Sequence, residues 1–201
     1  ENGLKLIVGA EFRLDTGLKL IVLARDRIGY GELCTLITDG RRAAGKGSYR
    51  VTADNFSDGL PHCCALWVPD NQLLLGTEDT WIIDTFRDRL WIAVELLADG
   101  LERMRLERLR RLGHTLSLPL AASGDVHMHS RKRRVLQDTV TAIREGVTLD
   151  RAGFMLYPNG ERYLRSRKTL ETVYPEDLLQ ETLVIADSAD FSLGELRYEY
   201  P

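Results

Sequence analysis

The sequence predicts an α/β domain built around a mostly parallel sheet, which is either open or closed into a barrel. Short and nearly continuous apolar runs alternate along the chain with longer segments in which apolar residues recur every three or four positions. The first pattern is typical of buried strands and the second of amphipathic helices. Alternation of the two indicates parallel pairing, because each helix carries the chain back across the sheet.

Two similar apolar runs near the start predict two buried strands. They cover residues 4–12 and 17–25, share the letters LKLIV, and are separated by a turn over residues 15–17. A helix is expected next over residues 29–45, where leucines share one face.

The middle of the chain continues the alternation. A turn-rich stretch over residues 46–59 precedes a predicted strand over residues 60–69. A helix is expected over residues 77–89, with Thr77 as its N-terminal cap. The apolar run LWIAVELL, residues 90–97, predicts the next strand.

Two amphipathic helices are then expected, over residues 99–117 and 130–146, on either side of a strand that runs into a loop over residues 118–128. Gly146 is expected to end the second helix. The residues predicted to face the core are Leu101, Met104, Leu109 and Leu112 in the first helix, and Val135, Leu136, Val140 and Ile143 in the second.

The last part of the chain predicts a hairpin followed by helices. Residues 154–166 would fold back around Asn159 and Gly160, a pair typical of tight hairpin turns. Residues 166–191 predict a short helix and then a longer one that starts near Pro175.

Composition limits the class of protein. The 201 residues are 44% hydrophobic and 28% charged, which suits a globular domain with a sizeable core. A net charge of −3 argues against a chain that binds nucleic acid through its overall charge, although a local patch could do so. Apolar runs are too short for a membrane span, and the first residues do not resemble a secretion signal. Three cysteines indicate reduced thiols in a cytoplasmic protein, and the abrupt start suggests part of a longer polypeptide.

The stretch GDVHMHS places a carboxylate and two imidazoles at alternate positions, Asp125, His127 and His129. Side chains two apart in an extended segment point to the same face. A carboxylate and an imidazole on one face suit Zn²⁺, Mn²⁺ or Fe²⁺, whereas the alternative is a polar loop in contact with water. Glu11 ends an apolar run, so it could be a third ligand or an ion-pair partner.

Other candidate residues carry weaker signals. Cys63 and Cys64 lie in an expected strand, where a cysteine is more often a small apolar residue than a ligand. Glu95 alternates with apolar side chains and could face either way. The basic run is either a solvated face or a contact for phosphate groups of a nucleic acid, and it consists of Arg131, Lys132, Arg133 and Arg134.

Four stretches occur in the order that characterises a known family: VGAEF, LIVLARDRIGYGELCTLIT, ASGDVHMHSRKRRVLQDTVTAIREG and LYPNGERYLRSRKTLETVYPEDLLQETLVIA. Together they resemble the PHP (polymerase and histidinol phosphatase) domain of bacterial family C DNA polymerases, the alpha subunits of DNA polymerase III. GDVHMH with its basic helix, LWIAVELL and LRYEYP resemble the error-prone second alpha subunit rather than the main replicative one. The resemblance covers essentially the whole chain.

This resemblance implies a distorted seven-stranded βα barrel of TIM-barrel type that lacks its first strands here. Residues 1–172 would form the PHP domain, and residues 173–201 a helix and linker that lead toward the polymerase palm. The implied metal ligands, for Zn²⁺ or Mn²⁺, are Glu11, Cys63, Asp125 and His127. Lys19 stands where the family often has a histidine, and a protonated lysine has no lone pair for a metal. The implied site is therefore degenerate.

The resemblance also implies a function for the parent protein. It would be an error-prone DNA polymerase, a nucleotidyltransferase used in translesion synthesis, damage-induced mutagenesis, DNA repair and replication. Its Mg²⁺-dependent polymerase site would follow Pro201, and its partners would be primer–template DNA, a sliding clamp and mutasome accessory proteins. For the domain itself we expect a structural, non-catalytic role, and for this segment alone no hydrolysis. The alternative is a phosphoesterase or 3′–5′ exonuclease that uses a metal-activated water.

Overall fold

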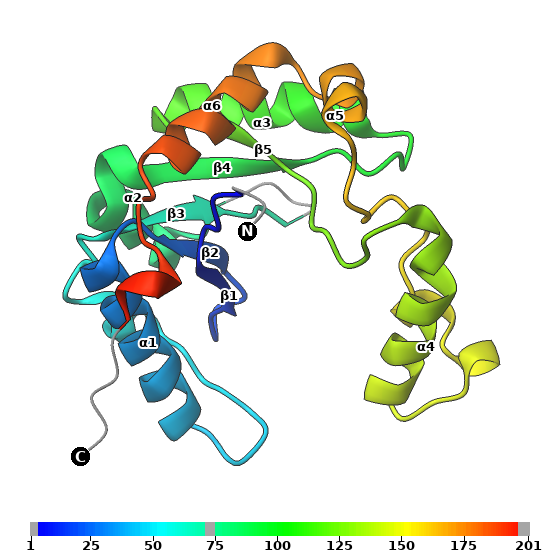
Figure 1. Cartoon of the computed structure of the whole chain (residues 1–201), viewed down its shortest axis with the longest axis horizontal. Coiled ribbons are helices and arrows are strands. Elements are labelled where there is room, and N and C mark those ends of the chain that lie inside the picture. Colours follow the sequence, from blue (N-terminus) through cyan, green and yellow to red (C-terminus); the bar gives the residue numbers. More distant parts are fainter. Residues whose placement is uncertain (1–3, 71–74, 197–201) are drawn as a thin grey trace.

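The computed structural model describes residues 4–70 and 75–196, which form an open five-stranded sheet with helices around it (Figure 1). The strands are β1 Gly9–Arg13, β2 Lys19–Ala24, β3 Cys63–Trp67, β4 Leu90–Glu95 and β5 Leu120–Ser123. The helices are α1 Arg27–Arg42, α2 Trp81–Phe86, α3 Glu102–Leu116, α4 Arg134–Arg144, α5 Arg167–Val173 and α6 Glu176–Asp187. Among the described residues, no helix is both long and apolar enough to cross a bilayer.

The sheet is half antiparallel. Its strands lie in sequence order, and β1–β2 and β2–β3 pair antiparallel, whereas β3–β4 and β4–β5 pair parallel. The prediction of a mostly parallel sheet was therefore wrong for the first two pairings. The short connection between β1 and β2 permits only antiparallel pairing, because a parallel crossover needs a dozen or more residues. In the described part of the chain β1 and β5 are the free edges, so closure into a seven-stranded barrel stays a prediction.

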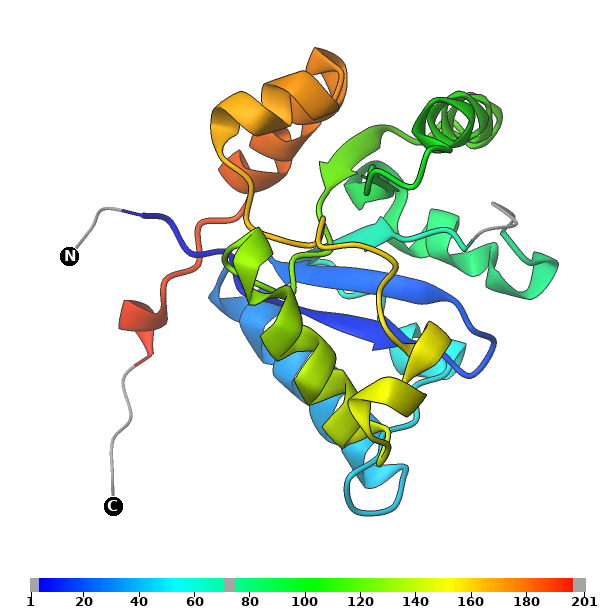
Figure 2. The same cartoon turned by 90° about the vertical axis from the view of Figure 1, so that its right-hand side faces the viewer.

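Both faces of the sheet are partly covered. Side chains that alternate along the strands, such as Val22, Trp67 and Ile92, enter the main core beneath α1, α2 and α3. The opposite face carries a smaller core in which Trp91 and Ala121 lie near Ile185 of α6. Helix α6 packs along β5, and Figure 2 shows α3 and α6 on different sides of that strand. The domain boundary expected at residue 172 stays a prediction.

The first apolar run is less buried than expected. Strand β1 starts only at Gly9, and most of its residues are exposed. Leu4 and Leu6 lie in solvent because β2 ends at Ala24, where the chain turns into α1. The prediction of a buried strand over residues 4–12 was therefore wrong, since its first part has no strand to pair with among the described residues.

Two local predictions also failed. Thr77 caps no α-helix, because it begins a short 3₁₀ turn, Thr77–Asp79, that precedes α2. Thr16 Oγ1 donates to the Asp79 carboxylate of this turn at 2.9 Å. Residues 154–166 form no hairpin. Asn159 Nδ2 instead donates to the carbonyl of Leu97 at 2.6 Å, which ties this segment to the end of β4.

The amphipathic helices differ from their predicted orientation. In α3, Leu109 is buried and Leu112 packs against the core, whereas Met104 and the preceding N-cap residue Leu101 are half exposed. In α4 the whole predicted core face is exposed, because the helix stands apart from the sheet (Figure 1). The apolar pattern was correctly identified, but no described residues cover it.

Candidate functional site

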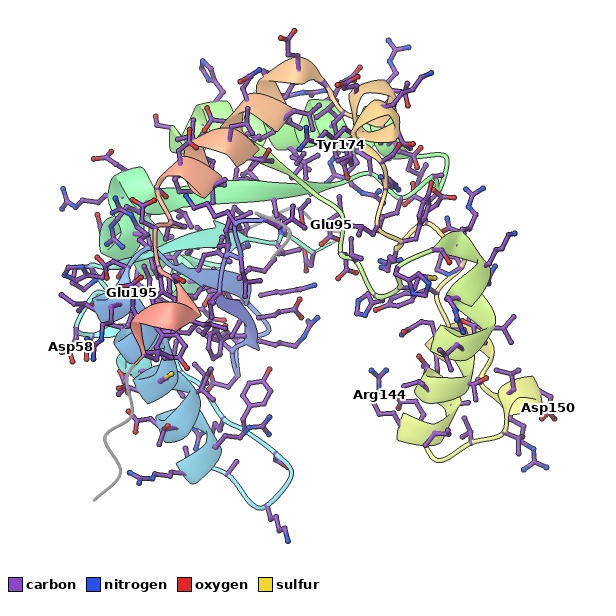
Figure 3. The ribbon with its side chains drawn as sticks, in the orientation of Figure 1. Asp58, Glu95, Arg144, Asp150, Tyr174 and Glu195 are labelled. Atoms are coloured by element: carbon purple, nitrogen blue, oxygen red, sulfur yellow. The ribbon has the colours of Figure 1, made fainter. Side chains whose placement is uncertain are left out.

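Charged side chains gather where β3, β4 and β5 end. Glu95 is the last residue of β4 and pairs with Ser123 at the end of β5. Lys19 begins β2, which runs antiparallel to β3, so it lies at the same end of the sheet as the last residues of β3, β4 and β5. Figure 3 shows Glu95 near this end, toward the segment that leads to α4. The cluster borders a cavity of about 290 Å³ whose lining includes Glu95 and Arg162.

Asp125 lies at the centre of the cluster. Arg162 Nε donates to its Oδ2 at 2.6 Å, and Lys19 Nζ lies 4.0 Å from its Oδ1. Burial by itself would raise the pKa of Asp125, but the Arg162 hydrogen bond and the Lys19 charge outweigh burial and hold the pKa below its ordinary value. Asp125 also has a φ of +41°, which turns the chain out of the strand direction. The carboxylate is therefore ionised and paired with two cations.

Lys19 connects the two carboxylates that the sequence placed far apart. Its Nζ lies 3.0 Å from Glu11 Oε2, in addition to its contact with Asp125. Burial alone would lower the pKa of Lys19, but the hydrogen bond to Glu11 and the charge of Asp125 raise it above its ordinary value. The ammonium thus remains protonated and has no lone pair to donate.

His127 joins the cluster through its side chain. Its Nε2 lies 3.1 Å from Asp125 Oδ1 and 2.9 Å from the hydroxyl of Tyr157. The guanidinium of Arg162 lies over the Tyr157 ring, 4.0 Å from its centroid. Burial, followed by the charge of Asp125, raises the pKa of Tyr157. His129 is exposed and does not enter this group.

Glu95 is the least satisfied member of the cluster. Burial raises its pKa, and the charge of Asp125 adds to this increase, while Lys19 and Arg162 oppose it. Its Oε1 is buried without a hydrogen-bond partner among the described residues. A protonated Glu95 would avoid placing an uncompensated charge there.

Within the described residues, the cluster offers a divalent cation no complete set of ligands. Lys19 and Arg162 supply the positive charge that balances Glu11 and Asp125. Across the described residues, no group of three or more His, Cys, Asp or Glu side chains is positioned to hold a metal ion. The carboxylates of Glu11 and Asp125 can hold the protonated Lys19, and these ion pairs link the strands β1 and β2 to the loop after β5.

Cys63 and Cys64 lie outside this cluster. They begin β3, whereas the cluster lies where β3 ends, about 13 Å farther along at the usual rise per residue. Cys63 Sγ donates to the Gly29 carbonyl at 3.3 Å, on the face that packs against α1, and burial raises the pKa of both thiols. The structure therefore brings Glu11, Asp125 and His127 together but leaves Cys63 apart.

Sequence reasoning missed Tyr157 and Arg162. Both flank the Asn159–Gly160 pair that predicted a hairpin, so they were assigned to strands of that hairpin. The segment returns to the cluster instead, where His127 N–H donates to the Arg162 carbonyl at 2.9 Å. No motif in the sequence indicates that return.

Half of the basic run is already engaged within the protein. Arg131 pairs with Glu161, and Arg134 Nε lies 3.5 Å from Asp138. Lys132 and Arg133 are exposed and form no ion pair with the described residues. A nucleic-acid contact at this run, which stays a prediction, would therefore depend mainly on these two cations.

Comparison with known proteins gives consistent similarities. No protein-family model matches the chain. Error-prone DNA polymerase of Methylococcus capsulatus is 50% identical over 99% of this chain, and that of Pseudomonas fluorescens strain Pf0-1 is 48% identical over 98% of it. Error-prone DNA polymerase of Pseudomonas aeruginosa is 46% identical over the whole chain. The chain spans 19% of the length of each. The chain is thus similar, from end to end, to a segment that makes up about a fifth of the length of each of these relatives.

Proposed function

We propose that residues 1–201 are one domain of an error-prone DNA polymerase, and that the domain is a structural platform rather than a hydrolase. Identity of 45–50% along the chain to proteins of that name supports the first part. The whole protein would then extend primers on damaged templates in translesion synthesis and repair, in the cytoplasm. Primer–template DNA, a sliding clamp and accessory proteins would be its partners.

One observation carries the structural role, the position of Lys19 between Glu11 and Asp125. A metal-dependent phosphoesterase or exonuclease needs an ion to activate water. An ammonium can balance charge but cannot bind or polarise a water in that way. The Arg162 guanidinium at 2.6 Å from Asp125 adds a second cation at the same carboxylate. Both cations disfavour the hydrolytic alternative.

The same contacts explain what a platform would do. Lys19 links β1 and β2 to the loop after β5, and Arg162 links that loop to the segment that follows α4. Charged hydrogen bonds between partly buried groups are stronger than neutral ones and fix geometry. The cluster thus holds the loop after β5 and the stretch around Arg162 at the strand ends of the sheet.

The full-length polymerase tests this proposal. We expect it to extend a primer past a damaged base, to release no phosphate from nitrophenyl phosphate, and to leave a 3′-mismatched primer intact. Elemental analysis should find no Zn or Mn beyond the polymerase site. Hydrolysis that disappears in His127→Ala while primer extension continues would overturn the structural role. Absence of primer extension by the intact protein would overturn the polymerase assignment.

A further inference from the structure

A second cavity lies where the end of β5 meets residues 163–165 and the helices α5 and α6. Its volume is about 290 Å³, and its apolar lining comes from all of these parts: Ala122, Val126, Leu164, Leu170 and Leu179. Val126 is 50% exposed and Leu164 is 66% exposed. The cavity therefore opens to solvent on their side, where a small molecule can enter.

A buried arginine lines this cavity. The side chain of Arg165 is only 4% exposed, and its Nη2 donates to the carbonyl of Leu96 at 2.9 Å. Its Nη1 is buried without a hydrogen-bond partner among the described residues. Buried polar atoms nearly always have a partner, because a donor that loses water without gaining an acceptor is destabilising. The unpaired Nη1 therefore indicates that the cavity receives a group that accepts a hydrogen bond.

The charge around Arg165 indicates that this group is an anion. Glu161 Oε2 lies 3.5 Å from Arg165 Nη2, but the same carboxylate also pairs with Arg131. One carboxylate thus serves two guanidiniums, which leaves one positive charge in excess. The side chain of Arg131 is 65% exposed, so water screens its charge, whereas the charge of Arg165 is buried. A negative acceptor at Nη1 would form a stronger hydrogen bond than a neutral one.

Water alone satisfies Arg165 poorly. The hydroxyl of Tyr174, at the turn between α5 and α6 (Figure 3), already donates to the Ser123 carbonyl at 2.6 Å. The hydroxyl of Thr182 already donates to the Leu179 carbonyl at 2.6 Å. An ordered buried water usually needs two to four polar partners, and the aliphatic side chains of the lining supply none. A ligand that combines an anionic head with an apolar body would satisfy both the arginine and the lining.

We propose that this cavity binds a small carboxylate with an apolar body. The carboxylate accepts a hydrogen bond from Arg165 Nη1, and the aliphatic or aromatic body packs against Leu170 and Leu179. Inorganic phosphate fits less well, because its remaining oxygens would face apolar side chains. The cavity is slightly smaller than the 300–1,000 Å³ typical of sites for drug-sized molecules, so the ligand is small.

The proposed ligand would act on the position of the last two helices. It would contact β5, residues 163–165 and both α5 and α6 at once. A molecule that binds only when these parts are together stabilises that arrangement. This role goes beyond the proposed function, because it needs neither polymerisation nor the charged cluster around Asp125.

Photolabelling of the full-length protein tests the site. The probe is 4-azidobenzoate, and peptide mapping locates the label. We expect saturable labelling within residues 122–126, 163–165 or 170–182 that benzoate suppresses. Benzyl alcohol has the ring without the charge, and inorganic phosphate has the charge without the ring. Each should suppress labelling at least roughly tenfold less well than benzoate, because the charged hydrogen bond and the apolar contact are both needed.

Three variants separate the site from non-specific labelling. Arg165→Met removes the donor and keeps the aliphatic bulk, so it should raise the half-saturating probe concentration at least roughly tenfold. Arg103→Met is the matched control, because this side chain is 95% exposed, and the control should bind as the wild type does. Thr182→Phe fills the cavity from α6 and leaves Arg165 in place. It should abolish the labelling and serves as the test if Arg165→Met misfolds.

Each outcome has a defined meaning. Saturable labelling of these segments that is lost in folded Arg165→Met or Thr182→Phe supports the proposal. Labelling that does not saturate, that phosphate suppresses as well as benzoate does, or that persists in both variants overturns it. Absence of labelling also overturns it, and is the result expected if another part of the polypeptide fills the cavity. Primer extension by the same preparation reports on the proposed function separately, because it needs no ligand at Arg165.

Discussion

The ammonium of Lys19 lies 4.0 Å from Asp125 Oδ1 and 3.0 Å from Glu11 Oε2, so it bridges two carboxylates from distant parts of the chain. A divalent cation between the same oxygens would need ligands with free lone pairs, and Lys19 offers none. A bridge of this kind keeps the two carboxylates together without a metal. Its contribution to stability can be measured directly.

Lys19→Met is expected to lower the free energy of unfolding by about 1–2 kcal/mol, because it leaves Asp125 and Glu11 with one cation fewer while keeping the aliphatic bulk. Chemical denaturation measures the change. Lys46→Met is the matched control, since Lys46 is exposed in a loop and its change should stay within about 0.5 kcal/mol. Equal effects of the two variants would show that the bridge contributes nothing.

Arg162→Gln should be more damaging than Lys19→Met. Arg162 is mostly buried, donates to Asp125 at 2.6 Å and lies over the Tyr157 ring, so its loss removes a charged hydrogen bond and a cation–π contact. We expect a loss of about 2–4 kcal/mol in unfolding free energy. The exposed pair of Arg103 with Glu107 provides the control, where Arg103→Gln should cost less than about 0.5 kcal/mol. A loss no larger than that control would contradict the prediction.

The sequence predicted the order of strands and helices because apolar periodicity is a local property. It also offered Glu11 as a third ligand beside Asp125 and His127, and the structure does bring these three residues into one cluster, because ligand groups gather at strand ends. It could not reveal that Lys19 and Arg162 occupy the space between them, because nothing local brings residue 162 back to residue 125. The face of α4 was assigned to the core for a related reason. Periodicity shows that Val140 and Ile143 share an apolar face but not which surface covers it.

Glu95→Gln is expected to stabilise the protein at neutral pH. The folded state raises the pKa of Glu95, so its favourable contribution is fully present below the ordinary carboxyl pKa of about 4.3 and is lost as pH rises through the raised value. Glutamine cannot ionise and avoids that loss. Unfolding measured between pH 4 and 8 should show an advantage of the variant that grows with pH. Glu171→Gln, at an exposed position, should show no such growth.

The effect of Asp125→Asn on stability should have the opposite sign to that of Glu95→Gln. The folded state lowers the pKa of Asp125, so its contribution is present above about pH 3.9 and disappears as pH falls through the lowered value. Asparagine tolerates the positive φ at this position, so the backbone need not change. The variant should be less stable at pH 7, and the difference should shrink in acid. A difference that is constant across this range would show that Asp125 is not held ionised by its neighbours.

Addition of Mn²⁺ should leave the unfolding midpoint of the wild-type domain, residues 1–201 without the polymerase site, unchanged, and a chelator should not lower it. An ion that binds only the folded state stabilises it by about 2.7 kcal/mol at a hundred times its dissociation constant, so even weak binding would be visible. Lys19→His replaces the ammonium with a neutral ligand between Glu11 and Asp125, so this variant should respond to Mn²⁺ more than the wild type. Lys19→Met removes the cation without adding a ligand and is the matched control. A wild-type midpoint that rises with Mn²⁺ and falls with the chelator would mean that the lysine moves aside for a metal, and the cluster would then be a metal site.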